Sequence, residues 1–214
     1  MIIKSIFCKV NEGMKLEFSQ HQLEWQTIHK ADGFLGQIGG WSLKDPLKAC
    51  IFSFWQDLES YQNFMEEIHD RIFIASGQKE TYHSISVDLF QVEFGIPGPS
   101  SYILSTLEDC KFIRTTSSHF KEKNLHHFIE MQRNVWNSGI EKPTGLLGGE
   151  IAFSLKNKLH ILVFTGWNNQ THQNYLIDVF PDLKKVASPE QDILKEEDEQ
   201  FVVENSWRVN PNSN

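Results

Sequence analysis

One histidine of this chain stands where proton transfer would be possible. His69 lies in the segment YQNFMEEIHDRI (residues 61–72), whose apolar residues are spaced as in an amphipathic helix, with Glu66 and Asp70 close by. An imidazole inside a protein can act as a general base and remove a proton from an activated aromatic ring. A core histidine bonded to a backbone carbonyl would show the same pattern. His69 is therefore the candidate catalytic residue, with a packing role as the alternative.

Three further residues could line a pocket for an aromatic ligand. Trp25 falls in a segment with helical spacing, and Gln37 and Trp41 fall in the alternating segment GFLGQIGGW (33–41). Aromatic rings offer apolar contact area, and an amide offers one well-placed polar group. Large aromatics also fill cores, and polar groups in strands are often satisfied within the sheet. We predict Trp25, Gln37 and Trp41 as pocket residues and keep the packing roles open.

The four glycines of residues 33–41 suggest a phosphate-binding loop, but their context does not. A phosphate cradle needs glycines directly before a helix N-terminus, whose free N–H groups face the anion. Residues 33–43 instead alternate and lead into a turn and another strand pattern. The early glycines suit a helix end, and the later ones suit a bulge or a close approach of two backbones. We expect no nucleotide or other cofactor and no metal, since no P-loop or HExxH motif occurs.

Three segments recur in the same order 111 or 112 residues later. The pairs are GFLGQIGGW (33–41) with GLLGGEIAF (145–153), ACIFSFW (49–55) with ILVFTGW (161–167), and YQNFMEEIHDRI (61–72) with HQNYLIDVFPDL (172–183). Collinear matches of this kind indicate two diverged copies of one unit. In the last pair, Phe180 stands where the first copy has His69. The first copy thus places a titratable group at a position that the second copy treats as apolar.

Each copy is predicted to run strand, helix, strand, strand, helix, strand, the order of a ferredoxin-like βαββαβ unit. We predict an α+β protein with a first repeat at 1–95, a Pro/Gly/Ser-rich linker at 96–107 and a second repeat at 108–210. The charged stretch at 188–200 is predicted to be a solvated loop. The central strands ACIFSFW and ILVFTGW are apolar at nearly every position, so both of their faces should be buried. Two sheets packed face to face, an intrachain dimeric α+β barrel, would bury them.

The composition excludes several partners. The 214 residues carry a formal net charge of −8, which argues against nucleic acid and against an anionic membrane surface. No apolar run approaches the roughly 20 residues of a membrane span. Three cysteines without a CxxC pair indicate reduced thiols. We expect a cytoplasmic monomer with an intrachain pseudo-dimer, for which further homodimerisation stays open.

Several motifs in the first 90 residues resemble a known family. The stretches GFLGQIGGW, FWQDLESYQNFMEEIHDRIF and SVDLFQ resemble a bacterial family named YdbC-like, which has no assigned biochemical function. The order of elements resembles the dimeric α+β barrel superfamily, which includes antibiotic-biosynthesis-type mono-oxygenases. That resemblance implies the fold; relatives in the superfamily include cofactor-free oxygenases of aromatic rings and haem-degrading enzymes. The haem-degrading pairing of a helix tryptophan with a histidine about ten residues on is absent, since Phe64 and Ile74 stand there.

Two functions of different classes follow. The first is a small-molecule-binding protein, with a small aromatic ligand, that acts as a cofactor-independent mono-oxygenase on a phenolic or quinone-like substrate. The alternative is a non-catalytic binding or assembly module whose duplicated barrel only presents surfaces. A fold alone does not choose between them. A ligand site beside His69 would favour the first, and solid packing around it would favour the second.

Overall fold

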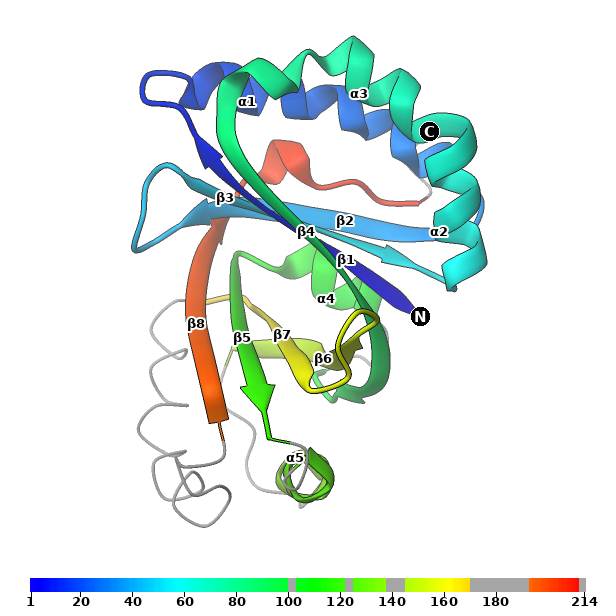
Figure 1. The fold of residues 1–214 in the computed structure, drawn as a ribbon, viewed down its shortest axis with the longest axis vertical. Coiled ribbons are helices and arrows are strands. Elements are labelled where there is room, and N and C mark those ends of the chain that lie inside the picture. The colour runs from blue at the N-terminus through cyan, green and yellow to red at the C-terminus, as the bar shows by residue number, and fades with distance from the viewer. Residues whose placement is uncertain (100–102, 122–124, 138–144, 170–192, 212–214) are drawn as a thin grey trace. The chain divides into compact units, whose positions relative to one another are not determined.

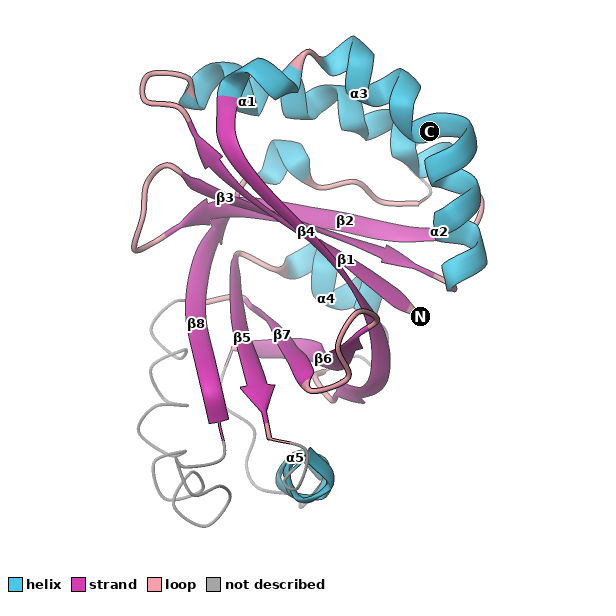
Figure 2. Cartoon of the chain, in the orientation of Figure 1, coloured by secondary structure: helices cyan, strands magenta, loops and turns pink. Residues whose placement is uncertain are grey.

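The computed structural model describes the whole chain except residues 100–102, 122–124, 138–144, 170–192 and 212–214 (Figure 1). The protein has an α+β fold (Figure 2). Its eight described strands are hydrogen-bonded in the order β1-β3-β2-β8-β5-β7-β6-β4, which closes on itself as a barrel. Two compact units make up the chain: unit 1 is Met1–Gln91 with Phe201–Asn214, and unit 2 is Val92–Gln200. Within the described ranges, no helix is both long and apolar enough to cross a membrane.

Unit 1 is a sheet with helices on one face. The strand order is β4-β1-β3-β2-β8, and α1, α2 and α3 lie together on one side of β1, β2 and β3 (Figure 1). The elements are β1 (Ile2–Val10), α1 (Lys15–Gln22), a 3₁₀ helix (Leu23–Lys30), β2 (Phe34–Ser42), β3 (Lys48–Trp55), α2 (Leu58–Phe64), a π-helical turn (Met65–His69), α3 (Asp70–Ser76), a 3₁₀ turn (Gln78–Thr81), β4 (Tyr82–Ile96), β8 (Ile193–Val203) and a 3₁₀ turn (Asn205–Trp207). Strands β4 and β8 continue into unit 2.

The glycine-rich segment is a bulged strand, as the sequence predicted. Strand β2 pairs with β3, and the register shifts between Phe34 and Gly36. Gly40 has no room for a side chain, because a Cβ there would lie 2.0 Å from the carbonyl oxygen of Val202 on β8. Gly39 and Gly40 therefore serve the close approach of neighbouring backbones, whereas Gly33 has a positive φ of 70°.

Unit 2 contains β5, β6 and β7 together with parts of β4 and β8, in the order β4-β6-β7-β5-β8. Strand β7 pairs antiparallel with both β5 and β6. The elements are α4 (Ile103–Asp109), β5 (Phe112–Phe120), α5 (Leu125–Asn137), β6 (Leu146–Ser154) and β7 (His160–Trp167). The predicted helix at 172–183, with Phe180, lies outside the described residues.

The central strands of both units are buried on both faces. Strand β3 is buried at every residue from Ala49 to Trp55, and β7 is buried except at His160 and Val163. The prediction of two-sided burial is therefore confirmed for each strand. The three cysteines, Cys8, Cys50 and Cys110, are buried thiols.

The segment between the predicted repeats contains a helix. Residues Ile103–Asp109 form α4, whereas the sequence suggested a linker over 96–107. Thr106 on this helix donates a hydrogen bond to the Leu147 carbonyl at 3.0 Å, and Leu107 is buried. Tertiary contacts of this kind stabilise a helix that is too short to form by itself.

The prediction of a loop over 188–200 is wrong from Ile193 onward, where the chain forms β8. The charges that suggested a loop, Lys195 to Glu199, are consecutive in this strand, and several of them have partners. Asp198 bonds to Arg114, and Lys195 pairs with Glu197 at 2.7 Å. Because successive side chains of a strand point to opposite faces, consecutive charges can find partners on each face separately.

The C-terminal segment belongs to unit 1, although the sequence placed residues through 210 in the second repeat. Trp207 is fully buried and its ring lies 5.5 Å from Phe18 and 5.1 Å from Trp41. Val209 forms a bridge with Gln37 of β2. The segment therefore completes the core of unit 1.

We predict that Trp207→Ala lowers the free energy of unfolding by about 3–5 kcal/mol, because it leaves a cavity in a closely packed core. Urea titration followed by circular dichroism measures this loss. Val202→Ala, at a residue of β8 that is 41% exposed, is the control and should cost less than about 1 kcal/mol. Equal midpoints for the two variants would contradict the role of the segment.

Candidate functional site

The candidate histidine ends a π-helical turn. Asp57 starts α2, since its carboxylate accepts a hydrogen bond from the Ser60 amide at 2.8 Å. Helix α2 ends at Phe64, and the π turn Met65–His69 leads directly into α3. Such turns are rare and are frequently found at functional sites.

The imidazole of His69 points inward, as the sequence predicted. Its side chain is 18% exposed, and its ring lies 5.4 Å from Trp25, 5.8 Å from Phe64 and 5.9 Å from Phe73. Nδ1 lies 2.9 Å from a carboxylate oxygen of Asp70. This contact orients the ring and leaves Nε2 as the nitrogen that could exchange a proton with a ligand.

A chain of amide side chains holds Trp25 against His69. The indole N–H of Trp25 donates to Gln78 Oε1 at 3.1 Å, and Gln78 Nε2 donates to Gln22 Oε1 at 2.8 Å. Both glutamines are buried. Neither Gln22 nor Gln78 was predicted as a site residue; for Gln22 the available signal was its place beside the apolar positions of a helical pattern.

The other two predicted pocket residues contact the C-terminal segment. Gln37 Nε2 donates to the Trp207 carbonyl at 3.3 Å, and the ring of Trp41 packs on Trp207 and Phe18. The structure thus brings Trp25 to His69, while Gln37 and Trp41 both contact Trp207. A pocket role for these two residues stays a prediction.

Lys4 is a buried cation that the sequence analysis missed. It lies on β1, and only 6% of it is exposed. Its Nζ lies 3.9 Å from Met65 Sδ, 5.6 Å from the ring centre of Tyr61 and 5.9 Å from that of Phe64. Burial lowers the pKa of Lys4 to about 8. The signal in IIKSIFCKV was its alternation, which places this lysine on the same face as Ile2 and Cys8.

Lys4 and His69 therefore border the same aromatic side chain. The ring of Phe64 contacts both the imidazole of His69 and the ammonium group of Lys4. Met65 and His69 are the two ends of the π turn. We call Lys4, Tyr61, Phe64, Met65, Trp25 and His69 the Lys4–His69 cluster. It combines a candidate base, a cation and aromatic surface, which is the composition of a site for an aromatic ligand.

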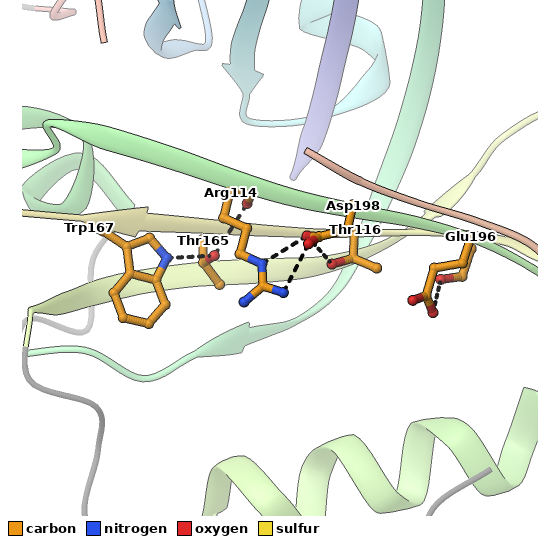
Figure 3. Close-up of polar contacts among 7 residues, drawn as sticks. Arg114, Thr116, Thr165, Trp167, Glu196 and Asp198 are labelled. Carbon is orange, nitrogen blue, oxygen red and sulfur yellow. Dashed lines mark hydrogen bonds and ion pairs between the residues drawn. The ribbon is translucent and has the colours of Figure 1, made fainter. Parts of the chain in front are cut away.

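Unit 2 holds a polar row along β5, β7 and β8 (Figure 3). The indole N–H of Trp167 donates to Thr165 Oγ1 at 2.9 Å, and Thr165 Oγ1 donates to the Arg114 carbonyl. Arg114 donates from Nε and Nη2 to the two carboxylate oxygens of Asp198, at 2.8 and 3.1 Å. This bidentate pair positions both side chains, since two parallel hydrogen bonds fix the planes of both groups.

Three solved structures share this fold over nearly the whole chain. A provisionally named monooxygenase from Fusobacterium nucleatum subsp. nucleatum ATCC 25586 covers 98% of this chain and 94% of its own, at 14% identity and a TM-score of 0.77. Another from Lactobacillus acidophilus NCFM covers 98% and 96%, at 9% identity and 0.74. An anthrone oxidase-like protein covers 99% and 93%, at 9% identity and 0.73. Identities this low show that these proteins share one fold, an α+β barrel, and they establish no activity for this chain.

The relationship in sequence is closer and falls on unit 1. The family model described as Domain of unknown function (DUF4937) matches residues 2–90. The uncharacterized protein YdbC of Bacillus subtilis (strain 168) is 36% identical over 93 residues, which cover 42% of this chain and 78% of that protein. This chain belongs to the YdbC family, as its motifs indicated. The whole Lys4–His69 cluster lies within the matched residues.

We predict that Lys4→Met stabilises the protein at pH 7 and loses this advantage as the pH rises. The pKa of Lys4 is about 8 in the folded protein, below its ordinary 10.5. Below about pH 8 the folded state carries the buried charge, at a cost on the order of 3 kcal/mol. Between about 8 and 10.5 the unfolded chain binds more protons than the folded one, so the native protein gains stability with pH.

Urea titrations from pH 7 to 10.5 measure this difference. Lys9→Met is the matched control, since Lys9 lies on the same strand but is partly exposed and paired with Asp45. A stability gain of Lys4→Met that does not narrow with rising pH would show that the charge of Lys4 is not the cause.

The Arg114–Asp198 pair should contribute measurably to the stability of unit 2. Both side chains are largely buried, and removal of one partner leaves an uncompensated charge. A double-mutant cycle with Arg114→Met and Asp198→Ala is expected to give a coupling energy of about 1–3 kcal/mol. The exposed pair Lys195–Glu197 is the control, with a coupling below about 1 kcal/mol. Equal coupling energies would contradict the assignment.

Proposed function

We propose that unit 1 binds a small aromatic molecule beside His69 and oxidises it with O₂ without a cofactor. The observation that supports this most is the setting of His69. The imidazole faces inward, rests on Trp25, and is oriented through Nδ1 by Asp70. A histidine oriented at one nitrogen by a carboxylate is prepared to accept a proton at the other.

The chemistry needs little beyond a base and a shielded site. Nε2 of His69 removes a proton from an activated CH₂ group of a phenolic or quinone-related ring system. The resulting carbanion is electron-rich and reduces O₂; one oxygen atom becomes the carbonyl of the product and the other leaves as water. The substrate supplies all four electrons, so the CH₂ group becomes C=O and no other reductant is needed. Trp25 and Phe64 provide an apolar surface that favours an aromatic substrate.

The second candidate is a non-catalytic binding or assembly module. The observation in its favour is that Gln37 and Trp41 pack on Trp207. If these contacts fill the core completely, Gln37 and Trp41 offer no surface to a ligand. In that case the Lys4–His69 cluster would be core structure and His69 a packed histidine.

We also infer that the two units are diverged copies of one βαββαβ unit. Strands β1 and β3 pair from Ile2↔Trp55 onward, and β5 and β7 pair from Phe112↔Trp167 onward, both antiparallel. In each unit the tryptophan indole donates to a hydroxyl two residues earlier, Ser53 or Thr165. The equal registers support a duplication, and an intrachain pseudo-dimer would follow from it.

We predict that His69→Phe strongly reduces turnover while the protein stays folded. Phenylalanine introduces no buried donor, so the cost in stability should not exceed about 1–3 kcal/mol from overpacking. Loss of a general base should lower the rate by about 10²- to 10⁴-fold. Oxygen consumption with anthrone as the probe substrate, together with the absorbance of the quinone product, measures turnover.

His83→Phe makes the same change at an exposed histidine of unit 1 and should leave the rate unchanged. Full activity of His69→Phe would remove His69 from the mechanism. If the native protein consumes no oxygen with anthrone or with other phenolic and quinone-related probes that bind, the binding module is the better description.

A further inference from the structure

Lys4 and Arg114 occupy the same position in the registers of the two units. Lys4 is paired with Ser53 across β1 and β3, and Arg114 is paired with Thr165 across β5 and β7. In both cases the cation stands beside the hydroxyl that accepts a hydrogen bond from the buried tryptophan. Each unit therefore places one cation at the same point on its sheet.

The two cations differ in what compensates their charge. Arg114 holds both carboxylate oxygens of Asp198 on the neighbouring strand β8. On the neighbouring strand of unit 1, β4, the residue opposite Lys4 is Leu89. In the described part of the chain, the contacts of Lys4 Nζ are the Met65 thioether and the rings of Tyr61 and Phe64, and none of them is a carboxylate.

This arrangement leaves an ammonium group incompletely satisfied. It has three N–H donors, and a thioether is a weak acceptor. A buried charge without a counter-ion is costly, and most proteins pair such a charge or do without it. Aromatic faces attract a cation but accept no strong hydrogen bond. Lys4 therefore lacks an anionic oxygen as a partner, whereas in unit 2 Asp198 supplies that oxygen to Arg114.

We propose that Lys4 binds the carboxylate of an aromatic ligand, with Tyr61, Phe64 and Met65 against the apolar part of that ligand. This proposal rests on the proposed function in unit 1 and specifies the class of ligand: a small aromatic acid. The ligand carboxylate takes at Lys4 the role that Asp198 has at Arg114. Lys4 binds and positions the ligand, while His69, which borders the same Phe64 ring, is left for the chemistry.

The test compares two probes of equal shape, 2-naphthoate and its neutral analogue 2-naphthamide, by isothermal titration calorimetry at pH 7. We expect 2-naphthoate to bind the native protein more tightly than 2-naphthamide. Lys4→Met should weaken 2-naphthoate binding at least tenfold and leave 2-naphthamide binding unchanged. Lys9→Met, the control on the same strand, should bind both probes as the native protein does.

A second variant keeps Lys4 and gives it a carboxylate partner within the protein itself. Leu89→Glu places a carboxylate opposite Lys4 and should also weaken 2-naphthoate binding at least tenfold. Equal binding of both probes to the native protein, or unchanged 2-naphthoate binding in Lys4→Met, would overturn the carboxylate site and leave the aromatic site standing. Binding of neither probe to the native protein would overturn both this proposal and the proposed function.

Discussion

The packing of one indole sets the geometry on which the candidate site depends. Trp55, at the end of β3, is fully buried, and its ring lies 4.8 Å from Phe64 and 5.8 Å from Tyr61. Its N–H donates to Ser53 Oγ at 3.1 Å, so the indole contributes a large apolar area without an unsatisfied donor. Helix α2 is thereby held to the sheet at the two aromatic residues that border Lys4. Because the π turn directly follows α2, the packing of Trp55 on Tyr61 and Phe64 also determines where Met65 and His69 lie.

The same region carries features that oppose folding. A lysine is buried next to a thioether, and a π turn interrupts a helix that could have been regular. Evolution rarely keeps such features for stability alone, because a more stable arrangement is easily reached by substitution. Their coincidence within one face of one unit, together with an inward-facing His69, is what makes this cluster the candidate site.

The fold and the side chains of the Lys4–His69 cluster bear on function in different ways. The solved structures with the same fold are at most 14% identical among the three compared, so they describe the backbone and leave the chemistry of the side chains open. The family relationship covers residues 2–90, where the Lys4–His69 cluster lies. Unit 2 lies beyond that match, yet it repeats the tryptophan-to-hydroxyl bond and fills its cation position with Asp198. The internal contrast between the two units is therefore the most informative comparison for function.

The sequence by itself determined what depends on neighbouring residues. The α+β class and the bulged glycine strand follow from periodicity and turn chemistry within short windows, and the inward direction of His69 follows from its place in an amphipathic helical pattern. The two-sided burial of β3 followed in the same way from its continuous apolar run.

Only the tertiary structure decided what depends on distant residues. A lysine in a strand resembles a surface residue until the π turn places Met65 against it. A run of charges resembles a loop until Arg114, far away in the sequence, pairs with Asp198 on β8. Trp207 could be assigned to unit 1 only once its contacts with Phe18 were known. In each case the deciding free energy belongs to a contact between segments that are far apart in the chain, and local pattern alone does not identify the partners in such a contact.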